Sequence, residues 1–249
     1  MCTLSWISNS QGYFVAFSRD ERRSRVPATG PRILERAGVR AIAPIDGEAG
    51  GTWIMVNELG LTLALLNGYR FQLENSPGQA ESTTWKSRGE LPLEALEALN
   101  VAEVAERLAR LDLARYRAFE LAAFDAAGGL SLGSWTGSAL VQRTLGSGDR
   151  PLVSSSFDDA GARNARRVEF ARMVGPRRGA DELERFHASH GPSRGPFSPC
   201  MHREDAHTVS FTRVLVSADQ VQLSYQAQAP CAGRPTERVE IPRRVLARS

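Results

Sequence analysis

MCTLSWISNSQGYFVAFSRDE (residues 1–21) contains the pattern from which both a first element of the fold and a candidate site can be predicted. Two apolar, β-prone runs, TLSWI and YFVAF, flank the turn-forming residues SNSQG. This pattern predicts a β-hairpin. Because the two ends of an antiparallel pair lie side by side, we expect Arg19 and Asp20 to lie near Cys2.

Cys2 is a candidate nucleophile. Methionine aminopeptidases remove an initiator methionine when the next side chain is small, and cysteine is small enough. Loss of Met1 would leave a thiol and a free α-amine on Cys2, which together form a nucleophile–base pair. An α-amine titrates at about 7.7–8.0, close to neutral pH, which suits a general base. The alternative interpretation is an ordinary cysteine beside the start codon.

Similar patterns predict the remaining regular elements. Paired β-prone runs predict hairpins, and apolar side chains spaced three or four residues apart predict amphipathic helices. In chain order we expect strands at 50–57 and 61–67, helices within 93–113, strands at 119–124 and 130–135, a helix at 160–174, an irregular connection at 176–199, and strands at 208–216 and 221–225. Asn100 is the expected N-cap of a helix that begins at Val101. Hairpins near both ends with helices between them indicate an α+β chain of two packed sheets flanked by helices.

The strand predicted at 61–67 ends in Asn67, a polar amide at the edge of a buried sheet. Acyl chemistry needs a nucleophile, a base, an orienting group and a donor for the oxyanion. Cys2 would be the nucleophile, Arg19 or Asp20 would orient it, and Asn67 would donate to the oxyanion. A nearby guanidinium would also lower the pKa of the thiol. The alternative is a surface ion pair at a strand end and an asparagine in a turn.

Composition narrows the class of protein. The chain has 249 residues, of which 24% are charged, and a net charge of +3. Lys86 is the only lysine, and the arginines are interleaved with acidic residues, which argues against nucleic-acid binding. The three cysteines indicate a reducing compartment rather than a disulfide framework. No signal-peptide pattern or membrane-spanning run is found, so we expect a cytoplasmic protein.

A second group of residues could bind a metal. Cysteine and histidine side chains recur in the C-terminal third, at Cys200, His202, His207 and Cys231. Such side chains can hold zinc or ligate haem iron. The Cys-x-His spacing is not a standard zinc arrangement, however, and no Cys-x-x-Cys is present, so the sequence favours a loop that leads into a strand. We expect His187 and His190 to be solvated side chains.

The arginines of residues 163–178 are the last candidate group. Arg163, Arg166 and Arg167 fall on one face of the predicted helix, with Asp159 and Glu169 close by. A site for an anionic ligand is one interpretation. A solvated, ion-paired helix surface is the more economical one.

Five short motifs occur in order over the first 90 or so residues. They are MCT (1–3), SRDE (18–21), GGTW (50–53), ALLN (64–67) and SRGEL (87–91), followed later by LVSSSF (152–157) and HREDAHTVS (202–210). With these motifs the chain resembles the NRDE, or transport and Golgi organisation, family of N-terminal-nucleophile-like proteins. That family is distantly similar to choloylglycine hydrolases and penicillin V acylases.

The resemblance implies a single domain over residues 1–249, built as a four-layer αββα sandwich of two mainly antiparallel sheets. It implies that Cys2 is the nucleophile, that Arg19 lies beside it and that Asn67 helps to form the oxyanion hole. It also suggests Arg203 as a second active-site arginine. Asp20 is assigned by proximity alone, because the choloylglycine group carries its active-site aspartate where this chain has Arg22.

These observations predict an N-terminal-cysteine hydrolase that acts on a linear amide or other small acyl substrate without a metal or cofactor. Substrate choice is expected to depend on loops such as 71–85. Two departures motivate a rival interpretation: Ser18 stands where the family motif begins with asparagine, and Arg22 replaces the aspartate. The rival is a non-catalytic protein on the same fold that binds or transports haem or lipid. The oligomeric state is left open.

Overall fold

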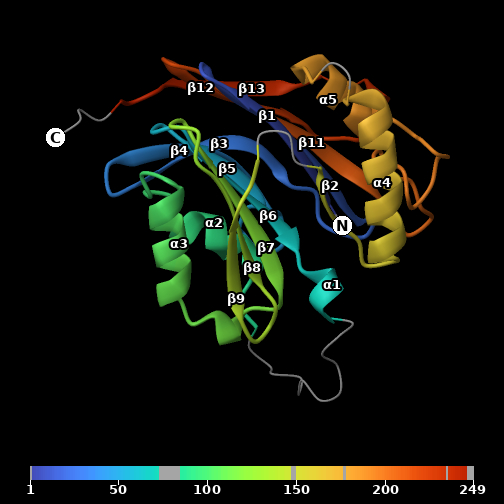
Figure 1. Ribbon diagram of the computed structural model, residues 1–249, viewed down its shortest axis with the longest axis horizontal. Helices are drawn as coiled ribbons and strands as arrows, with labels where there is room; N and C mark the ends of the chain where they lie inside the picture. Colours follow the sequence, from blue (N-terminus) through green and yellow to red (C-terminus); the bar gives the residue numbers. More distant parts are fainter. Residues whose placement is uncertain (1, 73–84, 147–149, 176–177, 234, 246–249) are drawn as a thin grey trace.

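The computed structural model describes residues 2–72, 85–146, 150–175, 178–233 and 235–245. Two antiparallel β-sheets are stacked face to face, and helices cover their outer faces (Figure 1). Most of the 71–85 loop lies outside the described residues. Within the described part, no helix has the length and apolar character needed to span a membrane.

The first sheet has the strand order β10-β1-β2-β11-β12-β13. Its strands are β1 (Cys2–Asn9), β2 (Gly12–Arg22), β10 (Leu152–Ser154), β11 (Ala206–Val216), β12 (Gln220–Gln226) and β13 (Glu237–Pro242). The second sheet runs in chain order, with β3 (Thr29–Arg36), β4 (Val39–Ile45), β5 (Ile54–Asn57), β6 (Leu61–Asn67), β7 (Phe119–Asp125), β8 (Leu130–Trp135) and β9 (Leu140–Thr144). The helices are α1 (Tyr69–Gln72), α2 (Leu91–Glu94), α3 (Val101–Arg110), α4 (Asp159–Met173) and α5 (Ala180–Ala188).

The register of the first hairpin confirms the sequence prediction. Cys2 pairs directly with Arg19, and the strands pair continuously to the turn at Asn9 and Gly12. Gly12 is required there, because a Cβ at this position would lie 1.9 Å from the carbonyl oxygen of Val216 on β11. The hairpin therefore fixes where Cys2 lies relative to the end of β2.

Apolar side chains fill three layers and make the αββα sandwich. Between the sheets, Leu4 and Phe17 of the first sheet pack in one cluster with Ile54 and Leu66 of the second. A second cluster joins the outer face of the second sheet to α2 and α3, and a third joins α4 and α5 to the first sheet. Because burying one such side chain contributes about 1.5–3 kcal/mol, these layers hold the sheets in a fixed relation. The predicted sandwich is confirmed.

Several elements differ from the sequence-based prediction, and β9, β10 and β13 form where no strand was expected. The connection expected to be irregular at 176–199 contains α5, whose Leu183 and Phe186 pack against the first sheet. β3 and β4 form where prolines and glycines gave no strand signal. β3 is an edge strand of its sheet, and there the missing N–H of Pro31 is compatible with strand structure.

Candidate active site

Cys2 lies at the start of a central strand, between the two sheets. Its strand, β1, pairs with β2 on one side and β10 on the other, where Cys2 faces Arg19 and Ser154. Asn67 is the last residue of β6 in the opposite sheet. The stacking of the two sheets thus brings residues separated by 65 positions in sequence to one place.

A cavity of about 290 Å³ opens at this place. Cys2, Arg19, Asp20 and Asn67, four of the five residues predicted for the site, line it. The other lining residues include acidic side chains, basic side chains and two tryptophans: Glu21, Arg25, Asp46, Trp53, Trp85, Lys86, Arg88 and Arg117. The sequence prediction therefore found four residues of the cavity wall but missed most of the others.

Arg19 is held as a fixed cation beside Cys2. Its guanidinium makes a very short ion pair with Asp46 and stacks over the ring of Trp53, 4.2 Å from the ring centroid. Arg25 donates to the other oxygen of Asp46 at 2.8 Å. Burial alone would raise the pKa of Asp46, but hydrogen bonds from Arg25 and the backbone N–H of Ala49, together with the charge of Arg19, lower it to about 2. Asp46 is therefore ionised and anchors Arg19.

Asp20 is buried and is held by residues from two other elements. The Nη2 atom of Arg166 lies 3.0 Å from one carboxylate oxygen, and the hydroxyl of Thr208 donates to the other at 2.7 Å. Arg166 is completely buried and also donates to the hydroxyl of Thr3. The interpretation of Arg166 as part of a solvated helix surface is therefore wrong. Its helix face is turned toward the sheet, and the Asp20 carboxylate compensates its charge.

The thiol of Cys2 is in an environment that keeps it protonated. Burial raises its pKa above the usual value, and the negative charge of Asp20 acts in the same direction. The positive charge of the N-terminal amine, the charge of Arg19 and a hydrogen bond from the backbone N–H of Asp20 oppose this increase in pKa without overcoming it. A base that accepts the thiol proton is therefore needed before Cys2 can attack a carbonyl carbon at neutral pH.

Asn67 offers a donor on the opposite wall of the cavity. One of its side-chain N–H groups donates to the hydroxyl of Tyr69 at 2.9 Å, which fixes the plane of the amide. An amide nitrogen carries two N–H groups, so the second can donate to a bound ligand. This arrangement suits stabilisation of an oxyanion.

Arg203 is not among the residues that line the cavity. Its guanidinium makes an ion pair with Asp205 at 2.7 Å and lies over the ring of Phe157, 4.7 Å from the centroid. His187, expected to be solvated, is fully buried instead. Its two ring nitrogens contact the hydroxyls of Ser5 at 2.9 Å and Ser18 at 2.7 Å. The prediction for His187 is wrong because α5 turns this face of the helix onto the first sheet.

The two stacked sheets and the helices that cover them make a fold similar to that of solved N-terminal-nucleophile-type hydrolases. The family model described as Transport and Golgi organisation 2 matches residues 1–147, so the chain belongs to that family. The sequence matches no curated protein.

Three solved structures illustrate the likeness of fold. The N-acylethanolamine-hydrolyzing acid amidase ortholog of Caenorhabditis elegans superposes with a TM-score of 0.60 at 10% identity, over 86% of this chain and 92% of that one. A mutant of the conjugated bile acid hydrolase of Clostridium perfringens gives 0.57 at 13% identity, over 97% and 92%. Penicillin V acylase of Agrobacterium tumefaciens gives 0.52 at 14% identity, over 91% and 83%. At these identities the likeness concerns the fold alone.

Proposed function

We propose that this protein is an N-terminal-cysteine hydrolase that cleaves a linear amide or related acyl compound of small size. The observation that carries the proposal is the position of Cys2 in the wall of the cavity, opposite Arg19 and across from Asn67. The three similar structures, an acid amidase, a bile acid hydrolase and an acylase, agree with it in the kind of reaction that their names describe. Removal of Met1 is part of the proposal, because it creates the base that the buried thiol requires.

The reaction would proceed in two halves. The α-amine of Cys2 accepts the thiol proton as the sulfur attacks the acyl carbon, and the resulting oxyanion receives a hydrogen bond from Asn67. The protonated amine then gives its proton to the departing nitrogen, which leaves a thioester on Cys2. In the second half the amine activates a water molecule that attacks the thioester, and the carboxylic acid and the free thiol are regenerated.

The charged neighbours of Cys2 would act as positioning residues. Arg19, anchored by Asp46, favours the thiolate electrostatically, and Asp20 presents its backbone N–H to the sulfur. Lys86, Arg88 and Arg117 also line the cavity. These cations favour a substrate that carries a carboxylate or another anionic group some distance from the scissile bond.

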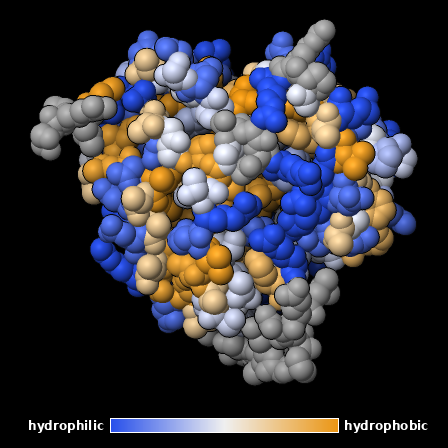
Figure 2. Space-filling view, in the orientation of Figure 1, coloured by the Kyte–Doolittle hydropathy of each residue, from blue (hydrophilic) through white to orange (hydrophobic). Residues whose placement is uncertain are grey.

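The rival function, non-catalytic binding of haem or lipid, would be served best by a largely apolar cavity. Charged side chains of β2, of segments that connect the strands and of residues 86–88 line the Cys2 cavity instead. On the face drawn in Figure 2, hydrophilic and hydrophobic side chains are interspersed. These features favour the hydrolase over the binding protein.

Release of amine from a panel of linear N-acyl compounds, some with an anionic group, tests the proposal. We expect Cys2→Ala to abolish turnover and Arg110→Met, which changes an exposed side chain on α3, to preserve it. Full turnover by Cys2→Ala would refute the proposed nucleophile. Saturable binding of haem by the unmodified protein, with no turnover of any substrate, would favour the rival function.

A further inference from the structure

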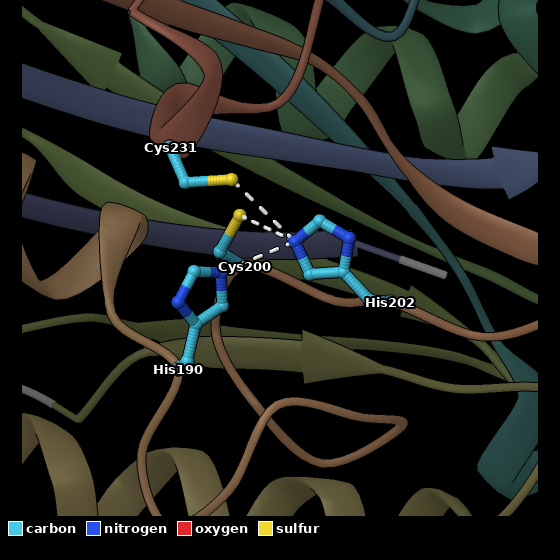
Figure 3. A group of neighbouring side chains, drawn as sticks. All are labelled: His190, Cys200, His202 and Cys231. Carbon is cyan, nitrogen blue, oxygen red and sulfur yellow. Dashed lines mark hydrogen bonds between the residues drawn. The ribbon is translucent and has the colours of Figure 1, made fainter.

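A cluster of four potential metal ligands lies outside the Cys2 cavity. Its members are His190, Cys200, His202 and Cys231, and one ligand atom from each lies within 4.8 Å of all the others (Figure 3). The side chains converge from three separate segments. His190 follows α5, Cys200 and His202 precede β11, and Cys231 lies in a 3₁₀ turn (Pro230–Ala232) between β12 and β13.

Three of the six distances between these atoms are close to those around a tetrahedral metal ion. Nε2 of His202 lies 3.1 Å from Nε2 of His190, 3.5 Å from Sγ of Cys200 and 3.5 Å from Sγ of Cys231. With bonds of about 2.0–2.1 Å to nitrogen and about 2.3 Å to sulfur, ligand atoms of a tetrahedral zinc site are separated by roughly 3.3–3.8 Å. Small side-chain adjustments are enough to complete the site.

We propose that these four side chains bind one divalent ion of the zinc class. Two thiolates and two neutral imidazoles form a closed Cys₂His₂ ligand set, which is typical of structural rather than catalytic zinc. Binding would release the two thiol protons to solvent, and the two thiolate charges would balance the ion. Arg194, whose Nη2 lies 3.4 Å from Nδ1 of His202, would turn away, since Nδ1 carries the proton once Nε2 binds the metal.

The surrounding backbone holds two of the ligands in place. The backbone N–H of Cys200 donates to the carbonyl of Ser189 at 3.0 Å, and that of His202 donates to the carbonyl of Gly195 at 3.2 Å. Cys200 is buried, whereas Cys231 is exposed. The exposed cysteine gives an ion a path from solvent to the buried ligands.

The fold changes the membership of the group suggested by the sequence. His207 lies on β11, paired with Glu21 of β2, and is not one of the four clustered residues. His190, expected to be solvated, takes its place because the chain folds back after α5 toward the start of β11. Because the four side chains come from three separate segments, their spacing in sequence does not resemble a standard zinc motif.

Metal binding at this cluster would support the candidate active site from a distance. The ion would tie the segment after α5 and the β12–β13 turn to the start of β11. Thr208, near the start of β11, donates to Asp20 and accepts a hydrogen bond from the backbone N–H of Met201 at 2.8 Å. The ion would therefore stabilise the support on which Asp20 depends, and it would take no part in acyl chemistry.

The test uses the full chain, purified under reducing conditions, stripped with a chelator and titrated with Co²⁺ and then Zn²⁺. We expect one Co²⁺ per chain with the visible d–d bands of tetrahedral cobalt and a thiolate charge-transfer band. Zn²⁺ should displace Co²⁺, so that the d–d bands and the charge-transfer band disappear, and it should raise the Tm of the protein. Cys200→Ser and His190→Gln should each weaken Co²⁺ binding at least tenfold. His190→Gln is the less disruptive substitution of the two, because the side chain of His190 is only half-buried whereas that of Cys200 is buried.

His207→Gln and Cys2→Ala are the matched controls, and both should bind Co²⁺ as the unmodified chain does. Three outcomes would overturn the proposal: no tetrahedral spectrum, equal binding by the cluster variants, or loss of binding in His207→Gln. A Cys200–Cys231 disulfide that persists under the reducing conditions and excludes the metal would also overturn it. Loss of hydrolysis with normal metal binding would affect only the proposed function.

Discussion

Breaking the buried ion pair between Asp20 and Arg166 should destabilise this protein severely. Both side chains have no solvent exposure, and their charged atoms lie 3.0 Å apart. Arg166→Met removes the guanidinium but keeps an unbranched side chain with good helix propensity. The variant leaves the Asp20 carboxylate buried without its cation, and removing one partner of such a pair costs about 3–5 kcal/mol.

Loss of the hydrogen bond from Arg166 to Thr3 adds about 1 kcal/mol to that cost. The expected decrease in the free energy of unfolding is therefore about 4–6 kcal/mol. This is a large part of the roughly 5–15 kcal/mol typical of a folded domain. Urea unfolding followed by circular dichroism measures it directly. Arg110→Met is the control, since Arg110 pairs with Glu106 on an exposed face of α3 and its loss should leave the midpoint unchanged.

The double variant separates the ion pair from other effects. Asp20→Asn alone should also destabilise the protein, and the combination of Asp20→Asn with Arg166→Met should cost about 1–3 kcal/mol less than the sum of the two. The reasoning is refuted if the free energy of unfolding of Arg166→Met lies within about 1 kcal/mol of that of the unmodified protein. Strict additivity in the double variant would refute it equally.

Three further predictions concern the site and its supports. Asn67→Ala should lower kcat about 10²–10³-fold with little change in KM, because the lost hydrogen bond forms only to the oxyanion; an unchanged kcat would remove Asn67 from the mechanism. Burial lowers the pKa of His187 to about 3, against about 6.5 in the unfolded chain, so the unfolded state binds the extra proton between these values. The contribution of neutral His187 to the free energy of unfolding is therefore fully present above about pH 6.5 and decreases as the pH falls, by up to about 1.4 kcal/mol per pH unit. Urea unfolding at pH 7, 5.5 and 4.5 should show a flatter pH dependence for His187→Gln. The same pH dependence in the variant and the unmodified protein would contradict the prediction. Gly51→Ala would place a Cβ 2.5 Å from the backbone of Gly89 in the cavity wall and should raise KM and lower Tm, while Gly195→Ala, with open space at that position, should leave Tm unchanged.

The elements that the sequence predicts well are those defined by local chemistry. The first hairpin follows from two apolar runs around a turn, and its register places Cys2 opposite Arg19 as expected. The N-cap at Asn100 is equally local, since its side chain accepts the backbone N–H of Glu103 only three residues away. The order of hairpins and helices indicates two packed sheets flanked by helices, whereas the four-layer αββα form is implied by the family resemblance.

The elements that sequence reasoning does not find depend on partners far along the chain. Nothing near Arg166 in sequence shows that it will be buried, because the carboxylate that makes burial tolerable is Asp20, 146 positions away. The same holds for His190, whose neighbours Cys200, His202 and Cys231 are brought to it only by the folding of the first sheet. A charged side chain or a histidine in a polar stretch is correctly predicted to be solvent-exposed only when no residue far along the chain pairs with it.

Arg203 illustrates the limit of transferring a role along a loose alignment. The residue type suits an active site, but its backbone lies in the turn before β11, where the N–H of Arg203 donates to the carbonyl of Ala206. From that turn the side chain reaches Asp205 and Phe157. Three residues of the SRGEL motif, Ser87, Arg88 and Gly89, in contrast, line the Cys2 cavity, although the motif suggested no role for them.

The mass of the intact protein, before and after a rapid reaction with an activated acyl compound, tests the proposed nucleophile most directly. The account predicts a chain that lacks Met1 and gains one acyl group, which peptide mapping places on Cys2 as a thioester that hydrolyses with time. Cys2→Ser should not form that thioester. A chain that keeps Met1, or one acylated equally at Cys2 and the exposed Cys231, would contradict the account.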